Sequence, residues 1–304
     1  MFRLRFGYLI TGITTGLVVI LGFFLSLPDG KLHIVFCDVG QGDAAYIRFP
    51  DGRDMLVDGG PDKRVLACLG RHMPFWDRHI NLVLLTHPQK DHMQGLIGVL
   101  DRFSADYILR SDVFNTTEGY RDFTNVISRT HVDTRYVVSG ETVTVGSTTL
   151  SVLWPSAGQI ATMRPSSSDV GYVGSVGDVL GAKAPENLND ASVVFALRYG
   201  SFDALFAGDA DRRVESGWQY GKLADETLEV LKYPHHGSKT AISETFLQRL
   251  KPELAVISVG KNSYGHPNES TLATLAQLAI DVKRTDKDGD IEVISDGRRW
   301  EVRK

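Results

Sequence analysis

The sequence predicts a mixed α/β (α+β) domain that follows one transmembrane helix. Short apolar runs with the length of strands alternate with stretches whose apolar residues recur at helical spacing. The alternation occurs in both halves of the chain and no internal repeat is visible, so we expect one domain built from two halves. An uncharged, mostly apolar stretch at residues 6–28 precedes the first of these strands.

This amino-terminal stretch is expected to be a retained membrane anchor. Arg3 and Arg5 precede it, and a helix of about 20 apolar residues is long enough to cross a bilayer. A cleaved secretory signal is the alternative, but no small-x-small cleavage site stands before Pro28. The two arginines favour an amino terminus inside and a folded domain outside the cell membrane. We therefore expect a single-pass protein with its anchor at residues 1–28 and its domain at 29–304.

Charge and cysteine content exclude several classes of protein. The net charge of −4 over 304 residues argues against a strongly basic nucleic-acid binder, although a nuclease with a local basic groove stays compatible with it. The two cysteines are too few for a disulfide scaffold or a cysteine-rich zinc module. Cys37 lies in a strand-like run and is most simply a buried small hydrophobic residue. Pairing with Cys68 is the other possibility.

The elements of the domain follow from these patterns in order. Gly-rich and Asp-Gly turns at 38–43 and 51–52 separate the first strands, and a second hairpin turns at 146–147. Apolar residues at helical spacing predict helices at 92–103, 122–130, 243–250 and 270–278. Strands are expected at 32–37, 44–49, 55–57, 81–85, 107–109, 135–138, 142–145, 148–154, 192–198, 202–207, 230–231, 254–258, 281–285, 291–295 and 300–303. The irregular stretch at 155–186 is long enough to be a functional loop or a lid.

Two histidine-bearing turns predict a metal site. Each directly follows a strand-like run, and Asp209 follows another such run between them. Imidazole nitrogen and carboxylate oxygen are the ligands that a hydrolytic divalent metal requires. One of the two adjacent histidines of the second turn is expected to bind metal and the other to shape the pocket, with His235 preferred as the ligand. The expected metal ligands are His87, Asp91, His92, Asp209 and His235.

Nine short motifs occur in a fixed order along the chain. They are Asp38–Asp43, Val57–Gly60, Thr86-His87-Pro88 with Asp91-His92, Asn189–Ser192, Ala207–Asp209, Pro234–Lys239, Ser258–Gly260 with Asn262, Tyr264–Pro267 and Arg284–Asp286. Together they resemble the metallo-β-lactamase superfamily, and in particular the hydrolase-like domain of ComEC-type DNA-uptake competence proteins. The resemblance implies a four-layer αβ/βα sandwich with metals at one edge.

One position departs from the pattern that the resemblance implies. The superfamily commonly has a second ligand two places after the first histidine, and this chain has Gln89 there. A neutral amide is a weaker ligand than carboxylate or imidazole, and the later ligand position falls near Asn187 to Asp190. We therefore expect one firmly held ion, Zn or Mn, and a second that is weak or absent.

The same residues suggest roles in catalysis, each with an alternative. Asp91 is expected to be a ligand or a general base, and Asp209 to bridge metals or orient the attacking hydroxide. Lys239 would meet a substrate phosphate or be only solvated, and His266 would donate a proton to a leaving group or only bond to the backbone. Asp58 would hold a ligand histidine, or cap a turn. Asp38, Gln41 and Asp43 would line the site or brace their turn.

The leading hypothesis from the sequence is a membrane-anchored phosphodiesterase or nuclease that acts on DNA outside the membrane. The resemblance implies a role in DNA uptake, for which a separate channel protein is the expected partner. Two alternatives stay open: hydrolysis of a small ester, lactone or nucleotide, and a nucleic-acid-binding module whose catalysis has decayed. Gln89 favours the binding module, whereas the four residues Asp91, His92, Asp209 and His235 oppose it.

Overall fold

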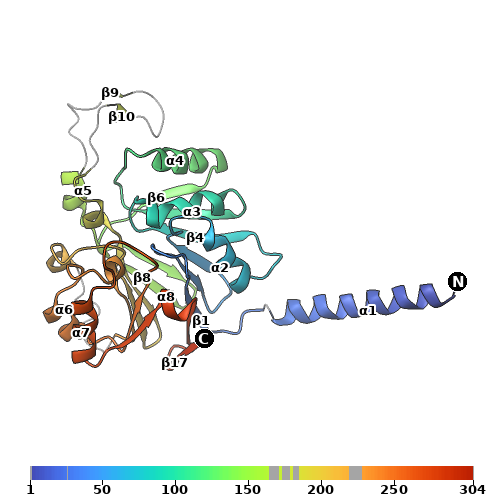
Figure 1. Cartoon of the computed structure of the whole chain (residues 1–304). Helices are drawn as coiled ribbons and strands as arrows, with labels where there is room; N and C mark the ends of the chain where they lie inside the picture. Colours follow the sequence, from blue (N-terminus) through green and yellow to red (C-terminus); the bar gives the residue numbers. More distant parts are fainter. Residues whose placement is uncertain are drawn as a thin grey trace.

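Two β-sheets packed face to face form the centre of the domain. The computed structural model describes residues 2–25, 27–163, 171–172, 179–180, 185–218 and 228–303. Helices cover the outer faces of the sheets, so the described chain forms four layers (Figure 1). This arrangement agrees with the αβ/βα sandwich expected from the sequence.

The first sheet has eight strands in the order β17-β16-β1-β2-β3-β4-β5-β6. Strands β3 to β6 run parallel, and the other neighbours are antiparallel. Helices α2 (Arg64–His72), α3 (Lys90–Leu100) and α4 (Glu118–Thr130) pack on its outer face. The strands are β1 (Leu32–Phe36), β2 (Ala45–Arg48), β3 (Asp54–Val57), β4 (His79–Leu85), β5 (Ser104–Arg110), β6 (Asp133–Tyr136), β16 (Ile291–Ser295) and β17 (Trp300–Arg303).

The second sheet has seven strands in the order β15-β14-β13-β12-β11-β8-β7. Strands β12 to β15 run parallel, and helices α6 (Glu244–Leu250) and α7 (Glu269–Gln277) cover its outer face. The strands are β7 (Thr142–Val145), β8 (Thr148–Trp154), β11 (Val194–Tyr199), β12 (Phe202–Phe206), β13 (Val230–Lys232), β14 (Leu254–Ile257) and β15 (Asp281–Arg284). The described residues also include two short helices, α5 (Ala157–Met163) and α8 (Thr285–Asp288), and a strand pair, β9 (Gly171–Tyr172) and β10 (Val179–Leu180).

Apolar side chains fill the space between the sheets. The ring of Phe206 stacks on Phe36 of the first sheet at 5.8 Å between centroids and on Phe195 of its own sheet at 4.8 Å. Strands whose residues are buried on both faces, such as β14, therefore have continuous apolar sequences. The rigid sheets bring the loops that follow β4, β12 and β13 to a common edge.

The expected positions of the strands and of helices α3, α4, α6 and α7 agree with the structure to within a few residues. Helix α2 was not expected from the sequence, and Cys68 on it forms a disulfide with Cys37. Cys37 is therefore buried, as expected, and paired as well. The possible lid at 155–186 lies mostly outside the described residues. Helix α5 and the β9–β10 pair are the described elements within this stretch.

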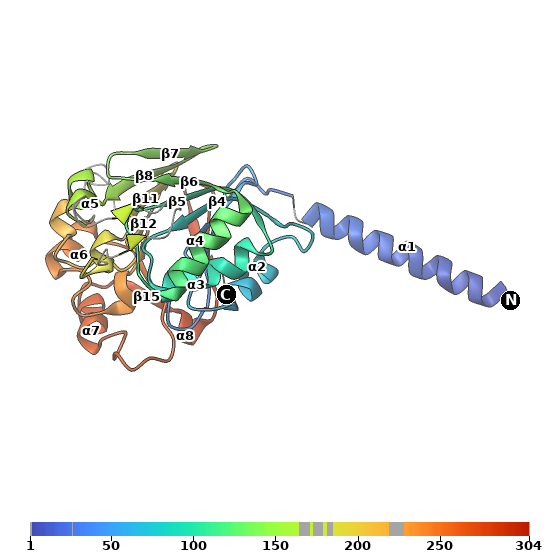
Figure 2. The same ribbon diagram turned by 90° about the horizontal axis from the view of Figure 1, so that it is seen from above.

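The segment expected to anchor the chain forms helix α1 (Phe2–Leu25), which extends away from the domain in both views (Figure 1 and Figure 2). Within the part of the chain that the structure describes, none of the helices combines the length and the apolarity that crossing a membrane requires.

Candidate metal centre

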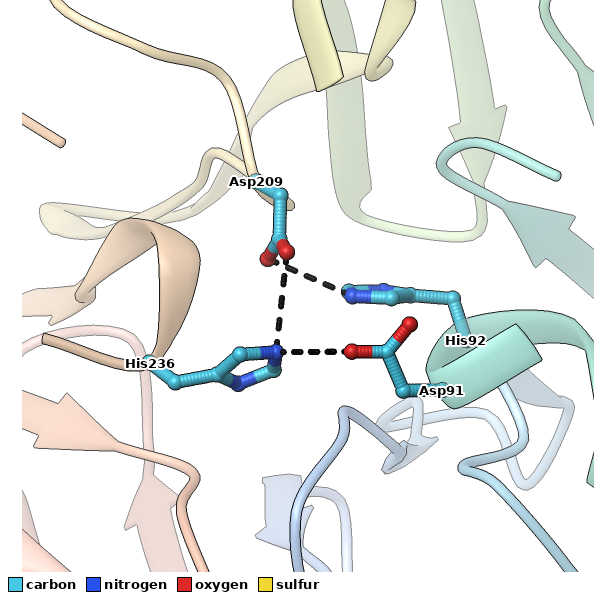
Figure 3. Close-up of side chains that lie close together, drawn as sticks. All are labelled: Asp91, His92, Asp209 and His236. Carbon is cyan, nitrogen blue, oxygen red and sulfur yellow. Dashed lines mark ion pairs between the residues drawn. The ribbon is translucent and has the colours of Figure 1, made fainter. Parts of the chain in front are cut away.

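Four side chains from distant parts of the sequence meet at one edge of the sandwich. Asp91 and His92 lie on the first turn of α3, Asp209 follows β12, and His236 lies in the turn after β13 (Figure 3). Their ligand atoms all lie within 4.8 Å of one another. The Nε2 atom of His92 is 3.2 Å from Asp209 Oδ1, and Nε2 of His236 is 3.4 Å from Asp91 Oδ2 and 3.5 Å from Asp209 Oδ2. These residues form the four-residue cluster.

A buried aspartate orients His92. The Oδ2 atom of Asp58 lies 2.7 Å from His92 Nδ1, and both side chains are buried. Thr86 fixes the same carboxylate, since its backbone N–H donates to Oδ1 and its hydroxyl to Oδ2, each at 2.8 Å. With Nδ1 bonded to Asp58, His92 presents Nε2 to the cluster. The geometry thus agrees with the interpretation of Asp58 as the residue that holds a ligand histidine.

A second brace holds His236. Its Nδ1 lies 2.9 Å from the carbonyl oxygen of Ser258 and 3.3 Å from Asp43 Oδ1. Lys232, buried at the end of β13, donates to the other oxygen of Asp43 at 2.6 Å. Sequence reasoning missed Lys232; the signal was a lysine within the apolar run of a buried strand. Asp43 therefore braces the site from behind, which leaves Nε2 of His236 facing the cluster.

Backbone geometry places Asp209 between the two histidines. Gly208 has a φ of +51°, and a Cβ there would lie 3.0 Å from Thr86 and 3.1 Å from Ser192. Glycine meets both demands, because it tolerates positive φ and has no Cβ. The hydroxyl of Ser192 then accepts a hydrogen bond from the backbone N–H of Asp209 at 3.2 Å. The chain turns sharply here and directs the carboxylate into the cluster.

The charges of the cluster are strongly coupled. Burial opposes ionisation of Asp209, but His236 and His92 outweigh it and hold the carboxyl pKa well below its ordinary value. Burial lowers the pKa of His236, yet Asp209 and Asp43 raise it overall to about 10. The pKa of His92 is likewise raised, since Asp209 and Asp58 outweigh burial. The carboxylates thus favour protonated histidines, and a divalent cation that binds Nε2 has to displace those protons.

The donor set of the cluster fits a divalent metal. Among the described residues, His92 Nε2, His236 Nε2 and Asp209 Oδ1 are buried without a hydrogen-bond partner. Their separations permit ion pairs, but their geometry does not form hydrogen bonds. Buried polar atoms without a hydrogen bond are costly, and one ion bound among these three would be a partner for all of them. Two imidazole nitrogens with carboxylate oxygens are ligands for zinc or manganese.

Two pairs lie next to the cluster, His87 with Gln89 and Asn189 with His235, and are together called the neighbouring group. The Oε1 atom of Gln89 is 3.3 Å from His87 Nε2, and Asn189 Nδ2 is 3.4 Å from His235 Nε2. The ring of His87 lies 4.2 Å from that of His92, between centroids. Burial and nearby His92 lower the pKa of His87 to about 4, so it is neutral at pH 7. Gln89 and Asn189 contribute neutral amides, so the group contains no carboxylate.

The structure places the two adjacent histidines differently from the expected arrangement, in which His235 was the preferred ligand. His236 belongs to the four-residue cluster, whereas His235 lies in the neighbouring group. Both residues have positive φ, 50° for His235 and 53° for His236, so the backbone departs from the regular pattern from which a direction could be read. His87 lies beside the cluster without belonging to it. Asp91, His92 and Asp209 meet as expected.

The other candidate residues lie around this edge. Lys239 is exposed, just after the turn that carries His236. His266 is half-buried, and its ring lies 5.5 Å from that of His235. Asp38 and Gln41 brace their surroundings, because Asp38 Oδ1 accepts from Gly40 N at 3.1 Å and Gln41 Oε1 from Gly260 N at 3.3 Å.

The fold and the cluster together define the class of a metal-dependent hydrolase. Residues 37–261 match the metallo-beta-lactamase superfamily, and the chain belongs to this superfamily. Among solved structures, the metallo-beta-lactamase fold protein YhfI of Bacillus subtilis superposes with a TM-score of 0.54. It covers 87% of this chain and 100% of YhfI at 12% identity, which shows a shared fold.

The chain is also similar to curated proteins, one of which is named as a competence protein. ComE operon protein 3 of Bacillus subtilis (strain 168) is 24% identical over an alignment of 302 positions, which covers 93% of this chain and 36% of that protein. Competence protein ComA of Neisseria gonorrhoeae is 35% identical over 106 residues, 34% of this chain and 15% of that protein. The chain thus spans about a third of the length of the Bacillus relative.

Proposed function

We propose that this protein is a metal-dependent phosphodiesterase or nuclease that acts on DNA in connection with competence. The observation that carries the proposal is the meeting of Asp91, His92, Asp209 and His236, with three unpaired buried atoms that face one another. The similarity to competence protein ComA supports the connection with competence. DNA as the substrate is what the sequence motifs imply through their resemblance to ComEC-type DNA-uptake proteins.

The ligands divide the work of the proposed reaction. His92 and His236 would hold the ion through Nε2, and Asp91 and Asp209 through carboxylate oxygens. A bound divalent cation would lower the pKa of water and polarise the scissile phosphate. The Asp91 side chain is 32% exposed, whereas the other three are almost fully buried, so Asp91 is the group that can reach attacking water and accept its proton. Asp209, between the two histidines, orients that water.

Two residues outside the cluster would contact substrate. Lys239 is exposed beside the turn of His236 and would pair with a phosphate oxygen. His266 lies at the rim, where burial and nearby His235 lower its pKa. We assign His266 the position next to the leaving group, where its ring can donate a proton or a hydrogen bond to that group.

We also propose that the domain lies outside the cell membrane, with residues 1–28 as its anchor and a separate channel protein as its partner. The disulfide between Cys37 and Cys68 supports an oxidising compartment, since such bonds are rare in the cytosol. Arg3 and Arg5, before the apolar segment, favour the same orientation.

A cleavage assay tests the proposal. The full chain is incubated with single- and double-stranded DNA in the presence of Mn²⁺, Mg²⁺ or Zn²⁺, beside the variants His92→Ala and Asp209→Ala. We expect cleavage by the wild type and its loss in both variants. If the protein hydrolyses small esters or lactones but does not cleave DNA, its substrate is a small molecule and DNA is excluded.

A binding module with decayed catalysis is the second candidate, because Gln89 places a neutral amide beside His87 in place of a stronger ligand. Tight DNA binding without cleavage under every metal would establish it. The retention of four charged or ionisable ligands in one cluster opposes it.

A further inference from the structure

An exposed tyrosine stands at the rim of the metal centre. Tyr264, in the loop between β14 and α7, has 74% of its surface exposed, the largest fraction among the apolar and aromatic side chains described in the domain outside α1. Exposing a large ring to water at this level brings no stabilisation to the fold. The position therefore calls for a role outside the packing of the domain.

The loop that carries Tyr264 is held in one conformation. Asn262 donates through Nδ2 to the carbonyl oxygens of Gly260 and His266, at 2.9 and 2.7 Å. Its Oδ1 accepts from the backbone N–H groups of Tyr264 and His266, at 3.0 and 3.1 Å. The exposed ring thus stands on a braced backbone, which is the arrangement of a preorganised contact.

A row of rings connects Tyr264 with the four-residue cluster. Its ring lies 5.9 Å from that of His266, with 33° between the planes. The His266 ring lies 5.5 Å from that of His235, and His235 lies 6.4 Å from His236. Buried Nδ1 atoms of His266 and His235 have no hydrogen-bond partner among the described residues. The row therefore leads from the surface to the reaction site through groups that can still bond a ligand.

The charges around this row suit a nucleotide chain. Lys261 begins the same loop and is exposed, as is Lys239 beside the turn of His236. Exposed lysines and an exposed aromatic ring near a site of cleavage are the elements with which proteins bind single strands, the cations meeting phosphates and the ring stacking on a base.

We propose that Tyr264 is a stacking platform for an unpaired nucleobase next to the phosphodiester at the metal centre. This inference rests on the proposed function and makes it more specific. Bases in a duplex are stacked on one another and do not offer a free face, so the platform selects single-stranded or frayed DNA. Tyr264 acts as a specificity-determining residue and takes no part in bond cleavage.

The test compares binding of two probes by the full chain with Mn²⁺. One is a fluorescein-labelled oligothymidylate of ~8 nucleotides, and the other is an abasic oligonucleotide of the same length. Stacking on one base predicts about tenfold tighter binding of oligothymidylate by the wild type. Tyr264→Ala should abolish this preference by weakening oligothymidylate binding alone, and Tyr264→Phe should retain it. Tyr107→Ala, which removes another exposed tyrosine, is the matched control and should behave as the wild type.

Equal binding of both probes by the wild type, or binding of neither, overturns the platform. Preference that survives in Tyr264→Ala, or is lost equally in Tyr107→Ala, overturns it as well. Cleavage is measured separately on the same samples. A base preference that depends on Tyr264, without any cleavage, refutes the proposed nuclease and supports the platform. Cleavage without a base preference supports the nuclease and refutes the platform.

Discussion

The four-residue cluster and the neighbouring group lie side by side at the same sheet edge but differ in charge and in bracing. In the cluster, each histidine is fixed through Nδ1, His92 by Asp58 and His236 by the Ser258 carbonyl with Asp43 nearby. In the neighbouring group, Gln89 and Asn189 contact the histidines through neutral amides. We infer from this difference that a metal site needs suitable ligands and also buried groups behind them that fix their orientation.

The largest effect is expected when each of the two adjacent histidines of the second turn is replaced by alanine in turn. His236→Ala removes a cluster ligand and should weaken binding of the first metal ion by about 100-fold or more, since a ligand costs more than the supporting contacts that fix it. His235→Ala, which removes the next residue, should keep that ion. Metal content of the purified proteins decides between them. Loss of the ion only in His235→Ala would return the ligand role to His235.

The bracing of His92 offers the next test. Asp58→Asn keeps the side-chain shape and tolerates the φ of 58°, but it removes the charge that faces Nδ1. Metal affinity should fall about 10- to 100-fold. Asp54→Asn is the matched control, because Asp54 is also buried on β3 and contacts Tyr46 and Asn81 instead of the cluster. Competition with a fluorescent chelator measures both affinities. Equal losses in the two variants would mean a general effect on folding.

Gln89→His should make the two groups more alike. An added imidazole beside His87 gives the neighbouring group a second nitrogen ligand and should raise affinity for a second ion by about tenfold. Isothermal titration with Zn²⁺ is expected to show one tight ion in the wild type and a second, stronger binding step in the variant. Two equally tight ions in the wild type would contradict the contrast between the groups.

The last prediction concerns the stability of the fold and a carboxyl outside both groups. Burial is the main cause that raises the pKa of Asp54 to about 6, although its hydrogen bonds from Asn81 and Tyr46 oppose it. The unfolded chain releases this proton at lower pH, so its contribution to stability is complete below the unfolded pKa and is lost as pH rises through about 6. The loss is about 1–3 kcal/mol. Urea denaturation between pH 4 and 7 should show a smaller decline in Asp54→Asn; parallel curves would exclude Asp54 as the cause.

Sequence patterns predicted most of the fold because burial leaves a periodic record. The apolar runs of β4, β12 and β13 mark strands buried between layers, and ligand types directly after them indicate a site at the strand ends. Helix α2 was missed, and with it the disulfide partner of Cys37. A helix of only nine residues offers few turns over which a helical period can be recognised, and its packing on the first sheet is what stabilises it.

The sequence by itself determined the kinds of atoms available to the site: Asp91, His92 and Asp209 could be named because their chemistry and their position after strands are local properties. Only the tertiary structure decided which neighbour of a pair faces inward, since the positive φ of both His235 and His236 breaks the periodicity that assigns side-chain direction. It also decided that Lys232 and Asp43, 189 positions apart, share one buried ion pair. Such contacts depend on how two sheets pack, and no local stretch of sequence carries that information.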